Sequence, residues 1–213
     1  MGVVTVSATF GCGGADIAPA VAARLGLPFH DRVIPAQVAL RMGVPVEEAE
    51  ANDESVVRGL WRVVASLGTM PDPVGGVLPG AGAVDERSFR LHTEHVLTEL
   101  AQVGGVVLGR AAAIVLGDRP DALHVRLDGP PQRRLAAAVA HLGRPEDDVR
   151  REMQATDRAR AAYVRHYHRC DPAEARLYHL VVDSTAFDHD LVVDLVVAAA
   201  RARGISGGTA AGA

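Results

Sequence analysis

Residues 11–16, Gly-Cys-Gly-Gly-Ala-Asp, place three glycines and a carboxylate between a β-branched run and a helical pattern. The preceding residues 3–6, Val-Val-Thr-Val, are typical of a buried strand. The following Ile17, Val21 and Leu25 lie four apart, on one helical face. A strand, a glycine-rich turn and a helix in this order aim backbone N–H groups at an anion, and the helix N-terminus adds partial positive charge. The sequence therefore predicts phosphate binding by Gly11, Cys12, Gly13, Gly14, Ala15 and Asp16.

Arginines are the cations available to such a phosphate. Residues 105–110, Gly-Val-Val-Leu-Gly-Arg, predict a buried parallel strand that ends in Arg110. The carboxyl ends of parallel strands face the ligand crevice, and arginine suits phosphate well, so Arg110 is expected to contact one. The chain has no lysine, which leaves arginine as its only permanently cationic side chain.

The turn departs from the Walker pattern G-x-x-x-x-G-K-[ST]. Aligned on Gly13, Ala8 takes the place of the first glycine and Gly14 that of the lysine. The hydroxyl residue is replaced by Ala15, or by Asp16 if one extra glycine is allowed. Asp16 is therefore a candidate metal ligand.

The pattern Gly11-Cys-Gly-Gly-x-x-Ile-Ala18, followed by Leu-Pro-Phe-His-Asp at 27–31, resembles the cytidylate kinase-like family. These proteins are relatives of the bacterial CMP kinases among the P-loop nucleoside monophosphate kinases. Gly109-Arg110, residues 157–163 and the Tyr-His-Leu-Val segment at 178–181 extend the resemblance over nearly the whole chain.

Alternation of expected strands near residues 3, 28, 105, 122 and 178 with helices predicts an α/β fold, a parallel sheet with helices on both faces. The resemblance implies a three-layer P-loop NTPase-type sheet in one domain over residues 1–203. It also implies a helical acceptor-binding insertion at about 32–103 and an Arg-rich lid at about 144–172.

The resemblance implies phosphoryl transfer from ATP, with Mg²⁺, to a CMP-like nucleoside monophosphate or a related small acceptor. In that case Arg110, Arg158 and Arg160 are catalytic, Asp31 and Arg110 bind the acceptor, and Asp16 holds the metal. Ala111 stands where CMP kinases carry an aspartate for the acceptor sugar.

Two alternatives stay open. The first is a catalytically silent nucleotide-binding module, favoured by Gly14 in place of lysine and by Ala111 in place of aspartate. The second is a dinucleotide-binding Rossmann domain, which rests on Gly11-x-Gly13 but meets Asp16 where a third glycine is needed.

Composition bounds the partners and the compartment. The net charge of −4 over 213 residues argues against broad nucleic-acid binding, and the expected partner is a small nucleotide. Two cysteines without zinc spacing, and neither a signal peptide nor an 18-residue apolar run, lead us to expect a cytoplasmic protein that does not enter membranes. The acceptor, the role of the Gly/Pro-rich loop 68–84 and the oligomeric state are not fixed, with a homodimer left open.

The C-terminal pattern predicts a helix over residues 188–203, with Leu191, Leu195 and Val196 facing inward. Residues 204–213 are poor in bulky side chains, so we expect them to form a flexible tail.

Overall fold

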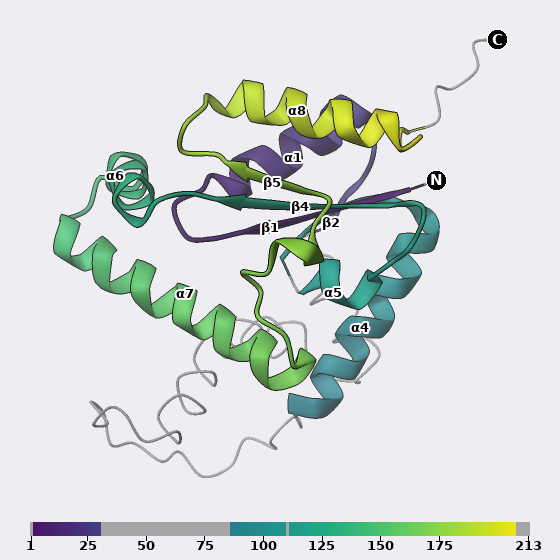
Figure 1. The fold of residues 1–213 in the computed structure, drawn as a ribbon, viewed down its shortest axis with the longest axis horizontal. Helices are drawn as coiled ribbons and strands as arrows, with labels where there is room; N and C mark the ends of the chain where they lie inside the picture. The colour runs from purple at the N-terminus through teal and green to yellow at the C-terminus, as the bar shows by residue number, and fades with distance from the viewer. Residues whose placement is uncertain (1, 31–85, 110, 208–213) are drawn as a thin grey trace.

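A computed structural model describes residues 2–30, 86–109 and 111–207 of the chain (Figure 1). In these residues five parallel strands form one sheet in the order β2-β3-β1-β4-β5. The strands are β1 (Val3–Ala8), β2 (Phe29–His30), β3 (Gly105–Leu108), β4 (Ala122–Asp128) and β5 (Leu180–Asp183). The predicted parallel α/β sheet is thereby confirmed.

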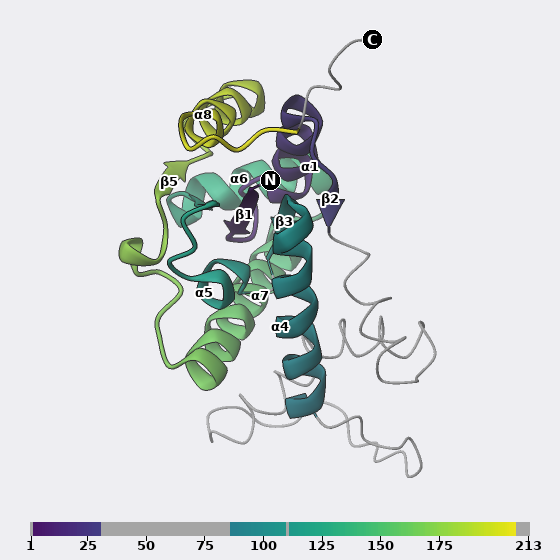
Figure 2. The same ribbon diagram turned by 90° about the vertical axis from the view of Figure 1, so that its right-hand side faces the viewer.

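Helices cover both faces of this sheet (Figures 1 and 2). One face carries α1 (Gly14–Leu25) and α8 (His189–Ala202), and the other carries α4 (Glu86–Val103) and α5 (Ala112–Leu116). Helices α6 (Pro131–Leu142) and α7 (Glu146–His168) follow β4, and a short 3-10 helix, η1 (Ala175–Leu177), precedes β5. Within the described ranges no helix combines the length and the apolar character needed to span a bilayer.

The strands are apolar on both faces because each face packs on helices. On the α1 and α8 side, Val4 and Val6 of β1 lie in one core with Ile17 and Val196. On the α4 and α5 side, Val3 and Val107 pack with Val96 and Leu97. These two cores form the interior of a three-layer fold.

The central strand β1 lies between β3 and β4, so the direction of strand succession reverses beside it. In open α/β sheets, ligands bind beyond the carboxyl ends of the strands at such a point. The usual dinucleotide-binding order is 3-2-1-4-5-6, whereas here β3 lies between β1 and β2. The Rossmann alternative therefore does not fit this sheet.

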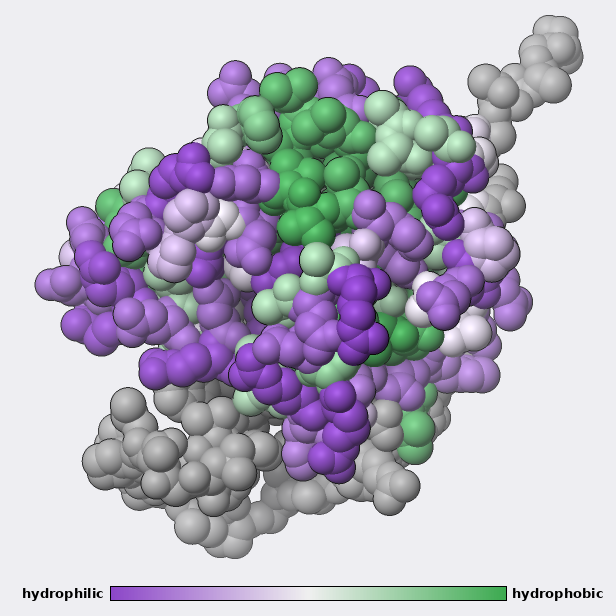
Figure 3. Space-filling model, in the orientation of Figure 1, coloured by the Kyte–Doolittle hydropathy of each residue, from purple (hydrophilic) through white to green (hydrophobic). Residues whose placement is uncertain are grey.

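Val196 faces inward as predicted, but two other expectations for the C-terminal region are wrong, and the first concerns Leu191 and Leu195 of α8. Its buried stripe consists of Val192, Val193, Val196, Val197 and Ala200. Leu191 and Leu195 are 47% and 42% exposed, because paired valines at i, i+1, i+4 and i+5 already fill the side that packs on α1. With Val181 and Phe187 they contribute to an apolar surface over α8 and β5 (Figure 3).

The second correction concerns the expected tail. Residues 204–207 pack against the fold: Ile205 is only 1% exposed and belongs to the core below α1 and α8. The Ile205 N–H donates to the Ala200 carbonyl, and the Gly207 N–H donates to the Leu25 carbonyl at 2.7 Å. One bulky residue and two backbone bonds are thus enough to fix this segment, and residues 208–213 lie outside the described residues.

A buried histidine, His124, joins β4 to its neighbours. Its Nε2 lies 2.7 Å from the Gly117 carbonyl and its Nδ1 2.8 Å from the Thr5 hydroxyl. A carbonyl only accepts, so Nε2 carries the proton and Nδ1 accepts from Thr5. Burial lowers the pKa of His124 below 6.5, and the stacked ring of His179 acts in the same direction.

This histidine makes folding pH-dependent. Because its folded pKa is depressed, the unfolded chain binds more protons below pH 6.5, and the free energy of unfolding falls as pH drops below that value. We expect wild type to be less stable to urea at pH 5.5 than at pH 7.5, and His124→Gln to show a flatter dependence. His141→Gln, at an exposed position on α6, serves as the control. If His124→Gln leaves the pH dependence of the unfolding free energy unchanged, His124 is not its source.

Candidate active site

The turn after β1 requires glycine at two positions. Gly11 (φ 82°) and Gly13 (φ 68°) have left-handed backbones, which side chains disfavour. Space is also lacking: a Cβ on Gly11 would lie 2.3 Å from the Arg134 carbonyl oxygen, and one on Gly13 would lie 2.4 Å from His189 Nε2. The turn therefore runs directly against the start of α6 and the first residue of α8.

Several backbone amides of this turn remain open. The N–H groups of Thr9, Cys12 and Asp16 donate to carbonyls. In the described part of the chain, no hydrogen bond is made by the amides of Gly11, Gly13, Gly14 and Ala15. They lie at the N-terminus of α1, where the helix dipole favours an anion.

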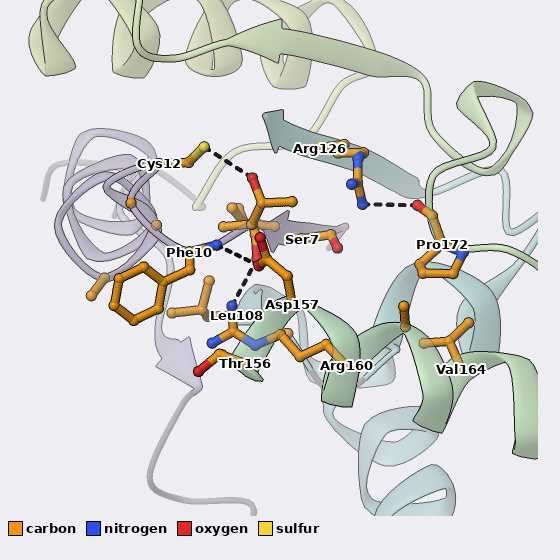
Figure 4. Close-up of a pocket in the computed structure, with 18 of the residues that line it drawn as sticks. Ser7, Phe10, Cys12, Leu108, Arg126, Thr156, Asp157, Arg160, Val164 and Pro172 are labelled. Carbon is orange, nitrogen blue, oxygen red and sulfur yellow. Dashed lines mark hydrogen bonds between the residues drawn. The ribbon is translucent and has the colours of Figure 1, made fainter. Parts of the chain in front are cut away.

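A cavity of about 780 Å³ adjoins the turn. It is lined by residues 5–16, by the ends of β3 and β4, and by the inner side of α7. In Figure 4, Arg126 and Arg160 lie on different walls of this cavity, with Ser7 between them. Cationic side chains and open amides thus share one space beyond the carboxyl end of the sheet.

An ion pair between α6 and α7 holds the turn. Arg134 Nη1 donates to Asp157 Oδ2 (2.6 Å) and to the Phe10 carbonyl (2.9 Å). The Phe10 N–H donates to Asp157 Oδ1 at 3.0 Å (Figure 4). Both backbone polar groups of Phe10 are therefore satisfied by this largely buried pair.

Arg160 brings a cation from α7 to the start of the turn. Its Nη1 donates to the carbonyl of Ala8, the last residue of β1, at 3.1 Å (Figure 4). The residue as a whole is exposed, yet desolvation of its guanidinium lowers the pKa of Arg160 from its ordinary value, against the opposing effect of nearby Asp157. The group stays protonated at neutral pH and is suited to an anion in the cavity.

A second buried ion pair, between Arg126 and Asp128, lies at the carboxyl end of β4. Arg126, 7% exposed, donates through Nε and Nη2 to Asp128 Oδ2 and through Nη1 to the Pro172 carbonyl. Asp128 Oδ1 accepts from the Thr9 hydroxyl at 3.1 Å. Burial alone would raise the pKa of Asp128, but the Gly129 amide and the Arg126 charge outweigh it and hold that pKa below 3.8. The pair joins β4 to the turn and to the segment after α7.

The sequence-predicted site residues divide into three groups. Residues 11–16 and Arg160 line the cavity together. Arg158 is exposed, donates to the Gln154 carbonyl of its own helix and is not among the lining residues. Asp31 and Arg110 lie outside the described residues.

The neighbour of Arg110, Ala111, carries a left-handed backbone at φ 53° and lines the cavity. Such a conformation is costly for alanine, and strained residues of this kind cluster at functional sites. The strained backbone of Ala111 therefore lies at the cavity, where such strain points to a functional role.

Sequence reasoning missed Arg126, Arg134 and the anchoring role of Asp157. Two signals were available. His124 and Arg126 alternate in an otherwise apolar strand, which places two polar groups on one face. Arg134 directly precedes Leu135 and lies four residues before Ala138, on the buried side of α6.

The loop anchor gives a stability prediction. Asp157→Asn leaves the Arg134 guanidinium buried without its counter-charge, which is expected to lower the free energy of unfolding by about 3 kcal/mol. Asp148→Asn, on the same helix, removes the partner of the exposed Arg151 and should cost less than about 1 kcal/mol. Urea unfolding of both variants checks this. Equal losses of unfolding free energy would contradict an anchoring role for the Arg134–Asp157 pair.

The sequence model of the cytidylate kinase-like family matches residues 3–186. A uronate isomerase from Corynebacterium glutamicum is 27% identical over 137 residues, which cover 64% of this chain and 26% of that protein. The chain thus spans about a quarter of the length of that curated relative.

Solved structures show the same fold at low identity. An uncharacterized protein from Eubacterium ventriosum has a TM-score of 0.67 at 15% identity, covering 94% of this chain and 99% of that one. A gluconokinase from Sinorhizobium meliloti has a TM-score of 0.52 at 16% identity, covering 96% and 93%. The family match spans most of the chain and agrees with its strand–turn–helix geometry: the protein belongs to the cytidylate kinase-like family.

Proposed function

We propose that this chain transfers a phosphoryl group from ATP to a CMP-like nucleoside monophosphate or a related small acceptor. The observation that carries the proposal is the set of open amides of Gly11, Gly13, Gly14 and Ala15, which border a cavity shared with Arg160. Phosphoryl transfer needs mainly positioning and charge neutralisation, and backbone N–H groups with an arginine provide both. Membership of a kinase-like family supports the same reaction class.

In this proposal the turn binds the donor phosphates. Arg160 neutralises charge at the start of the turn, where it already donates to the Ala8 carbonyl. Arg110 and Arg158 are proposed as further cations for the transferred group, and Asp31 as a contact to the acceptor. The remaining parts of the proposal are an acceptor-binding role for residues 32–103 and a lid role for residues 144–172, which include α7.

The residues present also fit Mg²⁺. This ion takes few protein ligands, usually one or two carboxylates, and completes its shell with substrate phosphates and water. Asp16 is exposed in the first turn of α1 and lines the cavity beside the open amides. In the described residues no group of three His, Cys, Asp or Glu forms a closed metal site, so Asp16 would share the ion with the donor phosphates. A bound Mg²⁺ supplies charge neutralisation between those phosphates.

The cysteines support a reducing, cytoplasmic setting. Cys12 and Cys170 are both free thiols, and burial raises the pKa of Cys12 above 9.0, which keeps it protonated and unreactive at neutral pH. The Cys12 side chain is buried in the core between the sheet and α1 and α8, and its sulfur lies 3.0 Å from the Thr9 hydroxyl.

Turnover assays test the reaction class. We expect ADP to form from Mg·ATP in the presence of one or more members of a panel of nucleoside monophosphates and small hydroxyl acceptors. Binding of Mg·ATP by calorimetry without acceptor-dependent ADP would favour the catalytically silent module. If the protein neither binds Mg·ATP nor forms ADP, that result would contradict a phosphate site at the turn.

The role of Arg160 is tested by substitution. Arg160→Ala removes a charge-assisted hydrogen bond to a donor phosphate, worth roughly 1.5–3 kcal/mol, so Mg·ATP affinity is expected to fall about 10- to 100-fold. Arg151→Ala, on an exposed side of the same helix, is the matched control and should leave affinity unchanged. An Arg160→Ala protein with wild-type affinity would refute the role given to Arg160.

A further inference from the structure

Position 14 is occupied by glycine because the fold leaves no room for a side chain there. Unlike Gly11 and Gly13, Gly14 does not have a left-handed backbone. A Cβ built on Gly14 would lie 2.6 Å from the Cβ of Ala8 and 3.4 Å from Leu108 Cδ1. A separation of 2.6 Å between two Cβ atoms cannot be relieved by rotating a flexible side chain, because neither atom can move without the backbone.

The same contact explains why this turn departs from the Walker pattern at two positions together. That pattern places glycine where this chain has Ala8, and lysine where it has Gly14. In each case only one of the two facing positions carries a Cβ. The glycine and the side chain have exchanged places across the contact.

We propose that Ala8 and Gly14 form a steric pair that admits a single Cβ and so bars a lysine from the turn, and that Arg160 takes the place of that lysine. The second half rests on the proposed function. Arg160 donates to the carbonyl of Ala8, the residue whose Cβ blocks position 14. The substitute cation therefore reaches the turn at the residue whose side chain blocks position 14.

This exchange moves the cation from the turn to a different helix. Arg160 lies three residues after Asp157 on α7, which places both on the same helical face. Asp157 anchors that face to Phe10 and Arg134, so the anchor also sets the position of the cation. In this chain, charge neutralisation at the turn depends on α7 being packed against it.

A mutant cycle with alanine tests the steric pair. Gly14→Ala is expected to raise the unfolding equilibrium constant roughly 10- to 100-fold through overpacking, although alanine otherwise favours helix. In the Ala8→Gly background the same change should raise it less than about threefold, because the facing Cβ is gone. Equal effects in both backgrounds, or no effect of Gly14→Ala, would overturn the steric pair.

A lysine in the relieved background tests the role of Arg160. In Ala8→Gly/Gly14→Lys, the loss of Mg·ATP affinity caused by Arg160→Ala should shrink to less than about threefold, since the lysine supplies the charge. The matched control is Ala8→Gly/Gly14→Ala, in which Arg160→Ala should keep its full effect of about 10- to 100-fold. If Arg160→Ala lowers Mg·ATP affinity equally in the lysine and alanine backgrounds, Arg160 does not take the place of the lysine.

The failure of the proposed function and the failure of the steric pair can be distinguished. A wild-type protein that does not bind Mg·ATP would overturn the proposed function and with it the assignment to Arg160. The alanine cycle is read from unfolding alone, so it decides the steric pair in either case.

Discussion

The ion pair between Arg134 and Asp157 fixes the one segment on which the rest of the site depends. It binds both the N–H and the carbonyl of Phe10, within the turn that joins β1 to α1. A buried pair offsets its desolvation only when such additional hydrogen bonds are made. Here those bonds set the path of the glycine turn, and they bring α7 against it at the same time. Arg160, three residues after Asp157, reaches the Ala8 carbonyl as a consequence.

The local features of the site were predictable from the sequence, and the long-range ones were not. Residues 3–25 form a strand, a glycine turn and a helix as predicted, because glycine placement and apolar spacing act within a few residues. The contact of Asp157 with Phe10 joins residues 147 positions apart, and no spacing rule finds it. Leu191 and Leu195 of α8 face outward, against the prediction, because leucine and valine compete for burial there and packing on α1 favours the valine stripe.

The segment at 204–207 shows a related limit of composition-based reasoning. Its small residues predict a tail, yet Ile205 occupies the core and Gly207 contacts the end of α1. A Cβ on Gly207 would lie 2.1 Å from the Gly26 carbonyl oxygen, so here a small residue is what permits packing. Strand order also follows from long-range pairing, and β3 inserts between β1 and β2 although α1 and β2 follow β1 directly in the chain.

The proposed chemistry follows from how charge is distributed around the turn. Backbone amides and the α1 dipole supply partial charges that cost no reorganisation, and an arginine on α7 supplies the full charge that a lysine provides in the Walker pattern. Because Ala8 and Gly14 share room for a single Cβ, this distribution is built into the backbone contact between β1 and α1. The absence of a lysine from the turn is therefore consistent with a working phosphate site, because the turn amides and Arg160 can supply the charge instead.

An amide chemical-shift titration of the ¹⁵N-labelled protein with Mg·ATP tests directly whether the turn binds the donor phosphates. We expect the largest changes at the open amides of Gly11, Gly13, Gly14 and Ala15, with smaller changes at Cys12, whose N–H already donates to the Thr9 carbonyl. Changes centred elsewhere, with the turn amides unaffected at saturating Mg·ATP, would show that the donor phosphates do not bind at this turn.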